Sequence, residues 1–178
     1  MKRAAVLVLA LGVAAAGCNK KSTTPTTPTG SSTFQTQFIF NTTILPSNEI
    51  PPVANAESVG RGVVGITVNV TRDGNGAITA GKVDYHITLT GFPATTNFTA
   101  AHIHEGNAAT NGPVRVQTGL ANSEIQLVAG GAQILKANID IGAAFAQAII
   151  DNPSGWYFNI HTTANGGGVA RGQLVRVQ

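Results

Sequence analysis

The stretch from Val64 to Leu89 constrains the fold most, because its apolar residues recur at every second position on both sides of a tight turn. Such alternation is typical of half-buried β-strands. The turn reads Asp73-Gly74-Asn75-Gly76, and Gly and Asn tolerate the positive φ angles that tight turns require. The inward-facing residues are Val64, Ile66, Val68 and Val70 before the turn, and Val83, Tyr85, Ile87 and Leu89 after it. The stretch therefore predicts an antiparallel β-hairpin.

Further short strands, separated by Gly- and Pro-rich turns, are expected on both sides of this hairpin. They are predicted at residues 34–40, 100–104, 114–118, 124–128, 132–139, 156–162 and 173–177. One amphipathic helix is also expected, with Asp140 as its N-cap and Asn152-Pro153 ending it. Its apolar face consists of Ile141, Ala144, Phe145, Ala148 and Ile149. This pattern predicts an all-β fold with one short helix, either a Greek-key-like β-sandwich or a flattened barrel.

The first residues are typical of a bacterial secretion signal. A basic Met1-Lys2-Arg3 precedes a short apolar run, and Ala15-Ala16-Gly17-Cys18 resembles a lipobox. We therefore expect residues 1–17 to be a lipoprotein signal peptide and Cys18 to be the lipidated N-terminus. The alternative is an ordinary signal peptide with an incidental thiol. Asn19 follows the cysteine, and by resemblance to enteric lipoproteins this favours the outer membrane of the bacterial cell envelope.

Residues 18–33 are predicted to be a disordered tether, because Thr, Ser and Pro dominate them and few apolar side chains are available for burial. The β domain is then expected at residues 34–178. Four of the eleven basic residues (Lys2, Arg3, Lys20 and Lys21) precede that domain, which leaves seven basic residues against eight acidic ones. A near-neutral domain without clustered Lys or Arg argues against a nucleic-acid partner.

Two motifs carry the candidate chemistry. His102 and His104 are two residues apart in a predicted strand, so both imidazoles project from the same face. His161 lies on the polar face of the predicted strand 156–162. Three imidazoles on polar strand faces predict a site for Cu or Zn, with Glu49 as the fourth ligand or as a group that orients a ligand. His86 is expected to be a surface residue.

The alternative is a structural role for these histidines. In that interpretation they hydrogen-bond to loop backbone, and Asn111, Asn159 and Arg171 complete a polar network. Arg171 and Glu49 are expected to form a structural salt bridge in this case. The residues alone leave both interpretations open.

Three blocks of the sequence resemble the chordin-type (CHRD) domain family, found in bacterial secreted proteins and animal chordins. The blocks are Asn48–Val53, then Ala101–Gly106 continuing into Asn111–Val114, and last Asn159–Thr162 followed by Gly168–Leu174. The resemblance implies an all-β extracytoplasmic module and no settled biochemical activity.

The expected function is that of a lipid-anchored, non-catalytic binding or structural module, with an extracellular protein or glycan as partner. No Gly-x-Ser-x-Gly elbow and no phosphate-binding glycine loop is present, so no catalytic residue is assigned. Binding of Cu or Zn is the alternative function. A superoxide-dismutase-like metalloenzyme is disfavoured, because such an enzyme uses more histidines than the four in this chain.

Overall fold

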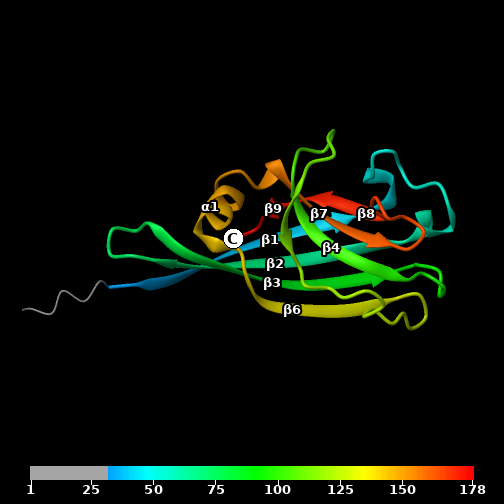
Figure 1. Ribbon diagram of the computed structural model, residues 1–178, viewed down its shortest axis with the longest axis horizontal. Coiled ribbons are helices and arrows are strands. Elements are labelled where there is room, and N and C mark those ends of the chain that lie inside the picture. The colour runs from blue at the N-terminus through cyan, green and yellow to red at the C-terminus, as the bar shows by residue number, and fades with distance from the viewer. Residues whose placement is uncertain (1–31) are drawn as a thin grey trace, which may run out of the picture. The chain divides into compact units, whose positions relative to one another are not determined.

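The computed structural model of the protein describes residues 32–178 (Figure 1). The predicted signal peptide at residues 1–17, Cys18, and the predicted tether up to residue 31 lie outside the described residues. The described elements are, in chain order, β1 (Phe34–Ile44), η1 (Pro46–Asn48), η2 (Ala56–Val59), β2 (Arg61–Arg72), β3 (Ile78–Thr90), β4 (Phe98–Glu105), β5 (Val114–Gln117), β6 (Ala132–Asp140), α1 (Gly142–Asp151), η3 (Pro153–Gly155), β7 (Trp156–Thr162), β8 (Ala170–Gln173) and β9 (Val175–Arg176).

The strands form two antiparallel sheets. The larger sheet has the order β6-β3-β2-β1-β9, and the smaller one has the order β5-β4-β7-β8. Figure 1 shows β4 and β7 crossing in front of the larger sheet. The described strands do not close into a barrel, so the predicted all-β sandwich with one short helix is confirmed.

The predicted hairpin forms the centre of the larger sheet. β2 and β3 pair antiparallel, with Val64 opposite Ile87, Ile66 opposite Tyr85 and Val68 opposite Val83. All the inward side chains predicted on these two strands are buried at 1% exposure or less. Each such Val, Ile or Leu contributes about 1.5–3 kcal/mol of hydrophobic stabilisation. The hairpin therefore supplies one wall of the core between the sheets.

The helix α1 packs against β3 at Gly81. A Cβ atom at position 81 would lie 2.5 Å from Cβ of Ala146, so only glycine allows this approach. Two details of the predicted helix are wrong. Its buried residues are Ala146, Ile149 and Ile150 rather than a face that includes Ala144. Its N-cap is Ile141 rather than Asp140, whose Oδ1 accepts a hydrogen bond from the backbone N–H of Gly142.

Two of the predicted strands are corrected. Residues 124–128 form an irregular loop, because Ser123 and Ala129 at its ends both have positive φ angles. The predicted strand at residues 173–177 is divided between the two sheets, since Gln173 ends β8 and Val175 begins β9. Leu174 is buried at the crossing point, and its backbone N–H donates to the carbonyl of Trp156.

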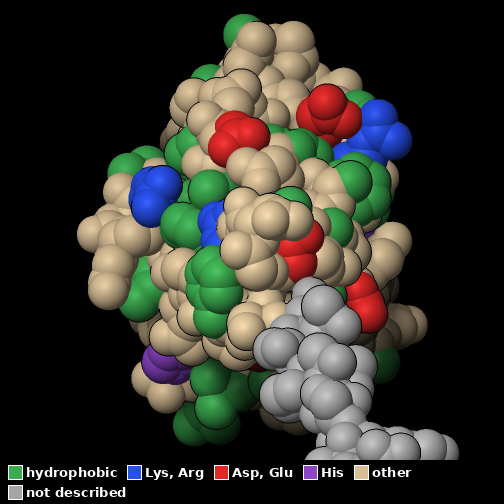
Figure 2. All heavy atoms as spheres, turned by 90° about the vertical axis from the view of Figure 1, so that its left-hand side faces the viewer, with side chains coloured by type: hydrophobic (Ala, Val, Ile, Leu, Met, Phe, Trp, Pro, Cys, Tyr) green, Lys and Arg blue, Asp and Glu red, His purple; other side chains and the backbone are tan. Residues whose placement is uncertain are grey.

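The surface carries few charges. On the face shown in Figure 2, acidic and basic side chains are scattered rather than gathered into one patch of either sign. Among residues 32–178, no helix combines the length and the hydrophobicity needed to cross a bilayer.

Candidate metal centre

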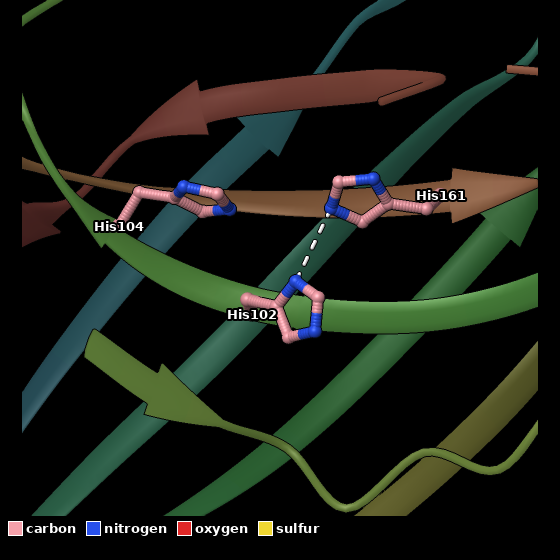
Figure 3. Close-up of side chains that lie close together, drawn as sticks. All are labelled: His102, His104 and His161. Carbon is pink, nitrogen blue, oxygen red and sulfur yellow. Dashed lines mark hydrogen bonds between the residues drawn. The ribbon is translucent and has the colours of Figure 1, made fainter. Parts of the chain in front are cut away.

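Three of the four histidines lie on the face of the smaller sheet that is turned away from the core (Figure 3). β4 and β7 pair antiparallel, with Ala100 opposite His161 and His102 opposite Asn159. The alternate residues of these two strands belong to the hydrophobic core between the sheets, among them Ile103 and Phe158. Because strand side chains alternate between faces, the histidines must project to the opposite side.

The structure brings His102, His104 and His161 together. Nδ1 of His102 lies 3.2 Å from Nε2 of His161. One ligand nitrogen from each of the three residues lies within 4.8 Å of the others. Two nitrogens bonded to one zinc ion at about 2.0–2.1 Å in tetrahedral geometry are about 3.3 Å apart. The spacing of the His102 and His161 nitrogens therefore fits two ligands of one ion. The nitrogen of His104 lies within 4.8 Å of them and would become the third ligand by moving closer.

Each histidine has a hydrogen-bond partner for the nitrogen that does not face the cluster. Nδ1 of His104 donates to the carbonyl of Gly112 at 2.9 Å, and Nδ1 of His161 donates to the carbonyl of Gly166 at 3.1 Å. His102 donates a side-chain hydrogen bond to Gln117, which acts to raise its pKa. Partners of this kind fix the tautomer and orientation of metal-binding histidines. They leave Nε2 of both His104 and His161 as the nitrogen with the lone pair, and that of His161 lies within hydrogen-bond distance of Nδ1 of His102 in this structure (Figure 3).

Nε2 of His104 is buried and has no hydrogen-bond partner among the described residues. An unsatisfied buried nitrogen costs about 1–3 kcal/mol. Coordination of a metal ion would remove this cost. The orphaned nitrogen is therefore a second observation, independent of spacing, that points to a ligand at this position.

The site keeps its imidazoles neutral. The pKa of His102 is lowered to about 4, chiefly by burial and also by the neighbouring His161 and His104, which disfavour a positive charge there. Burial also lowers the pKa values of His104 and His161. Because only the neutral imidazole offers a lone pair to a metal, these shifts favour metal binding at physiological pH.

The polar face of β7 is covered rather than exposed, which the sequence did not predict. All seven residues of β7 are buried, including Asn159 and His161. The loops that supply Gly112 and Gly166 lie against this face through their hydrogen bonds to the two histidines. The cluster is therefore enclosed by loops, and His102 is its least buried member.

Tyr157 and Arg171 extend the site along the sheet. The ring of Tyr157 stacks on His104 with centroids 4.8 Å apart, and the guanidinium of Arg171 lies 4.5 Å from the centre of the Tyr157 ring. Arg171 is 1% exposed. Its guanidinium donates hydrogen bonds at 2.8–3.1 Å to Oδ1 of Asn111 and to the carbonyls of Asn48, Thr110 and Ala108. Arg171 therefore holds two loops to the smaller sheet.

Glu49 does not join the three histidines. Its Oε1 and the side chain of Asn159 both lie so close to Gly168 that a Cβ there would contact them at 2.6–2.8 Å. Burial raises the pKa of Glu49 to about 7, although Arg171 and a hydrogen bond from Asn159 act in the opposite direction. The predicted salt bridge is absent, since within residues 32–178 no carboxylate oxygen lies within 4.0 Å of Arg171.

The remaining predicted residues are placed as follows. Asn111 hydrogen-bonds to Arg171 and, through its Nδ2, to the carbonyl of Ile50. His86 is exposed on the larger sheet, as expected. Tyr157 and Gln117 were missed by the sequence analysis. Tyr157 could have been identified from the sequence, because it lies at every second position with Asn159 and His161 and so shares their strand face.

Comparison with known proteins identifies one family. The model of the CHRD domain family matches residues 40–174. This range contains the three histidines, Glu49 and Arg171. No curated protein and no solved structure matches the chain.

Proposed function

Because the chain belongs to the CHRD domain family, we propose that it is a lipid-anchored, extracytoplasmic, non-catalytic module whose three-histidine cluster binds one Zn or Cu ion. Family membership supports the non-catalytic module. The cluster of His102, His104 and His161 supports the metal ion. Cys18 and the apolar run before it support the lipid anchor and a location in the bacterial cell envelope, with the outer membrane as the expected site.

The observation that carries the metal proposal is the spacing of 3.2 Å between Nδ1 of His102 and Nε2 of His161, with Nε2 of His104 unpartnered beside them. Imidazole nitrogens are suitable ligands for both Zn and Cu, so the ligand set does not select between these ions. In this role the metal joins β4 to β7 and, through the bonded carbonyls of Gly112 and Gly166, holds two loops in place.

Equilibrium dialysis against Zn²⁺ or Cu²⁺, followed by elemental analysis, tests the proposal. We expect one ion bound per chain of the wild type and of the His86→Ala control, because His86 lies on the other sheet. We expect His104→Ala to lose most of this binding. Equal binding by the wild type and by His104→Ala would contradict the site.

A structural role for the same histidines remains the second candidate. It is supported by the hydrogen bonds of His104 and His161 to loop carbonyls, which exist without any metal. Under this alternative, replacing the histidines lowers stability equally with and without added metal. An extracellular protein or glycan would then bind elsewhere on the domain, and its binding would persist in a folded variant that lacks all three histidines.

An oxidoreductase with two metal ions is not proposed. Within residues 32–178, His102, His104 and His161 are the one group of three or more potential ligands that could hold a metal ion. A second centre would need ligands that the described part of the chain does not bring together.

A further inference from the structure

The cluster offers three protein ligands rather than four. Zinc sites that serve a structural role are usually closed by four protein ligands, whereas sites with three protein ligands keep a position for an external ligand. Among the described residues, no fourth His, Cys, Asp or Glu joins the group whose ligand atoms lie within 4.8 Å of one another. If the cluster binds a metal as proposed, one coordination position has no His, Cys, Asp or Glu ligand from residues 32–178.

Two carboxylates, the predicted fourth ligand Glu49 and the adjacent Glu105, do not join the group of ligand atoms. Glu49 lies against Asn159 and Gly168, where Oε1 has no hydrogen-bond partner. Glu105 follows His104 directly, but it is exposed and its Oε2 accepts a hydrogen bond from Nε of Arg115 at 2.9 Å. Neither carboxylate is therefore among the ligand atoms that the cluster brings together.

The surroundings of the cluster carry a buried positive charge that forms no ion pair within residues 32–178, and Glu49 is the carboxyl group near enough for its pKa to respond to that charge. Arg171 is fully buried, and its guanidinium donates to backbone carbonyls and to the neutral side chain of Asn111. It stacks over Tyr157, which in turn stacks on His104. A buried charge is screened less than an exposed one, so the charge of Arg171 acts across the Tyr157 ring on the histidine cluster. Three neutral imidazoles, a divalent ion and this guanidinium together favour an anion.

We propose that the open coordination position takes an anionic oxygen donor, of the carboxylate class, from outside the domain. His102 marks the point of entry, because it is only partly buried while His104 and His161 are covered. The inference depends on the proposed metal site and adds the chemistry of its exchangeable ligand. The carboxylate belongs either to a free small anion or to an acidic side chain of a partner molecule.

The visible absorption spectrum of the Co²⁺-loaded full chain tests this proposal, because the d–d bands of Co²⁺ respond to a change of one ligand. Sodium acetate is the probe. Acetamide has the same shape without the charge, and sodium perchlorate at equal ionic strength controls for salt. The His104→Ala variant, treated identically, reports any Co²⁺ bound elsewhere.

We expect acetate to change the Co²⁺ spectrum with saturating dependence, and acetamide and perchlorate to leave it unchanged. A capped peptide with one Asp, compared with its Asn counterpart, then distinguishes a partner's side chain from a free anion, and either source agrees with the proposal. No response to acetate, or an equal response to acetamide, would overturn the proposal while leaving the metal site intact. Failure to bind Co²⁺, Zn²⁺ and Cu²⁺ alike would remove the proposed function itself, and this inference with it.

Discussion

Nδ1 of His102 lies 3.2 Å from Nε2 of His161, although 59 positions separate the two residues in the sequence. Their approach depends on the register of β4 and β7, in which His102 faces Asn159 and Ala100 faces His161. A shift of one residue would move His161 and its neighbours to the other face of the sheet. The same pairing that buries the core therefore also assembles the cluster.

The glycines that support two of the histidines provide a matched pair of variants. Gly112 and Gly166 each accept a hydrogen bond from a ligand histidine, but their surroundings differ. A Cβ at position 112 would overlap the backbone carbonyl of Glu105, whereas a Cβ at position 166 would meet no atom within 4 Å. We expect Gly112→Ala to weaken metal binding by about 10–100-fold, the usual effect of losing such a partner.

Isothermal titration with Zn²⁺ measures this difference, and Gly166→Ala serves as the control that keeps wild-type affinity. A Gly112→Ala variant that binds Zn²⁺ as tightly as the wild type would show that the Gly112 carbonyl does not orient His104.

Arg171 is expected to contribute more to stability than any exposed arginine. Replacing it with Met leaves the carbonyls of Asn48, Thr110 and Ala108 without their donor. Hydrogen bonds from a charged group contribute about 1.5–3 kcal/mol each, so the free energy of unfolding should fall by about 3 kcal/mol or more. Arg115→Met removes an exposed ion pair instead and should cost less than about 1 kcal/mol. Urea unfolding of both variants is the measurement, and similar losses in the two would contradict the role of Arg171.

Much of the fold was predictable because it depends on alternation. The hairpin of β2 and β3 and the exact limits of β7 follow from apolar residues at every second position. The division of residues 173–177 between two sheets was not predictable, because it depends on the burial of Leu174 between the two sheets in the folded protein. Local sequence pattern carries no information about such a crossing.

The candidate site was predictable in part for the same reason. His102 and His104 share a face by strand period alone, and His161 could be assigned to a polar face. The sequence did not determine whether the two histidine strands would be neighbours, and the pairing of β4 with β7 places His161 beside His102. The positions of Glu49 and of the loops over β7 could not be inferred, since they depend on long-range contacts such as those of Arg171.

Glu49 should make stability depend on pH. Its pKa is raised from 4.5 to about 7 in the folded protein, chiefly by burial. Between these two pH values the folded state binds more protons than the unfolded state. The contribution of Glu49 to the free energy of unfolding is therefore fully present below pH 4.5 and is lost as pH rises through about 7. We expect Glu49→Gln to gain stability relative to the wild type across this range.

Urea unfolding of metal-free protein at several pH values measures this effect. Glu105→Gln, which removes one exposed carboxylate, is the control for the change in net charge. Parallel stability curves for the wild type and Glu49→Gln between pH 4.5 and 7 would be inconsistent with a raised pKa at Glu49.

The lipid anchor rests on Cys18, the one cysteine of the chain. Cells that express the wild type and are fed a palmitate analogue should label the protein, and Cys18→Ala should abolish the label and release the protein from the membrane fraction. Cys18→Ser is a closer match in size and should behave like Cys18→Ala. Equal labelling of the wild type and Cys18→Ala would show that the protein is not anchored through this residue.

The metal centre is tested most directly by thermal unfolding with and without Zn²⁺ or Cu²⁺. An ion that binds the folded chain alone stabilises it by about 2.7 kcal/mol at a free concentration of 100 times Kd. We predict that added metal raises the Tm of the wild type and of His86→Ala, and leaves the Tm of His104→Ala unchanged. An equal rise in Tm for the wild type and His104→Ala, or no rise in the wild type, would contradict a metal centre formed by His102, His104 and His161.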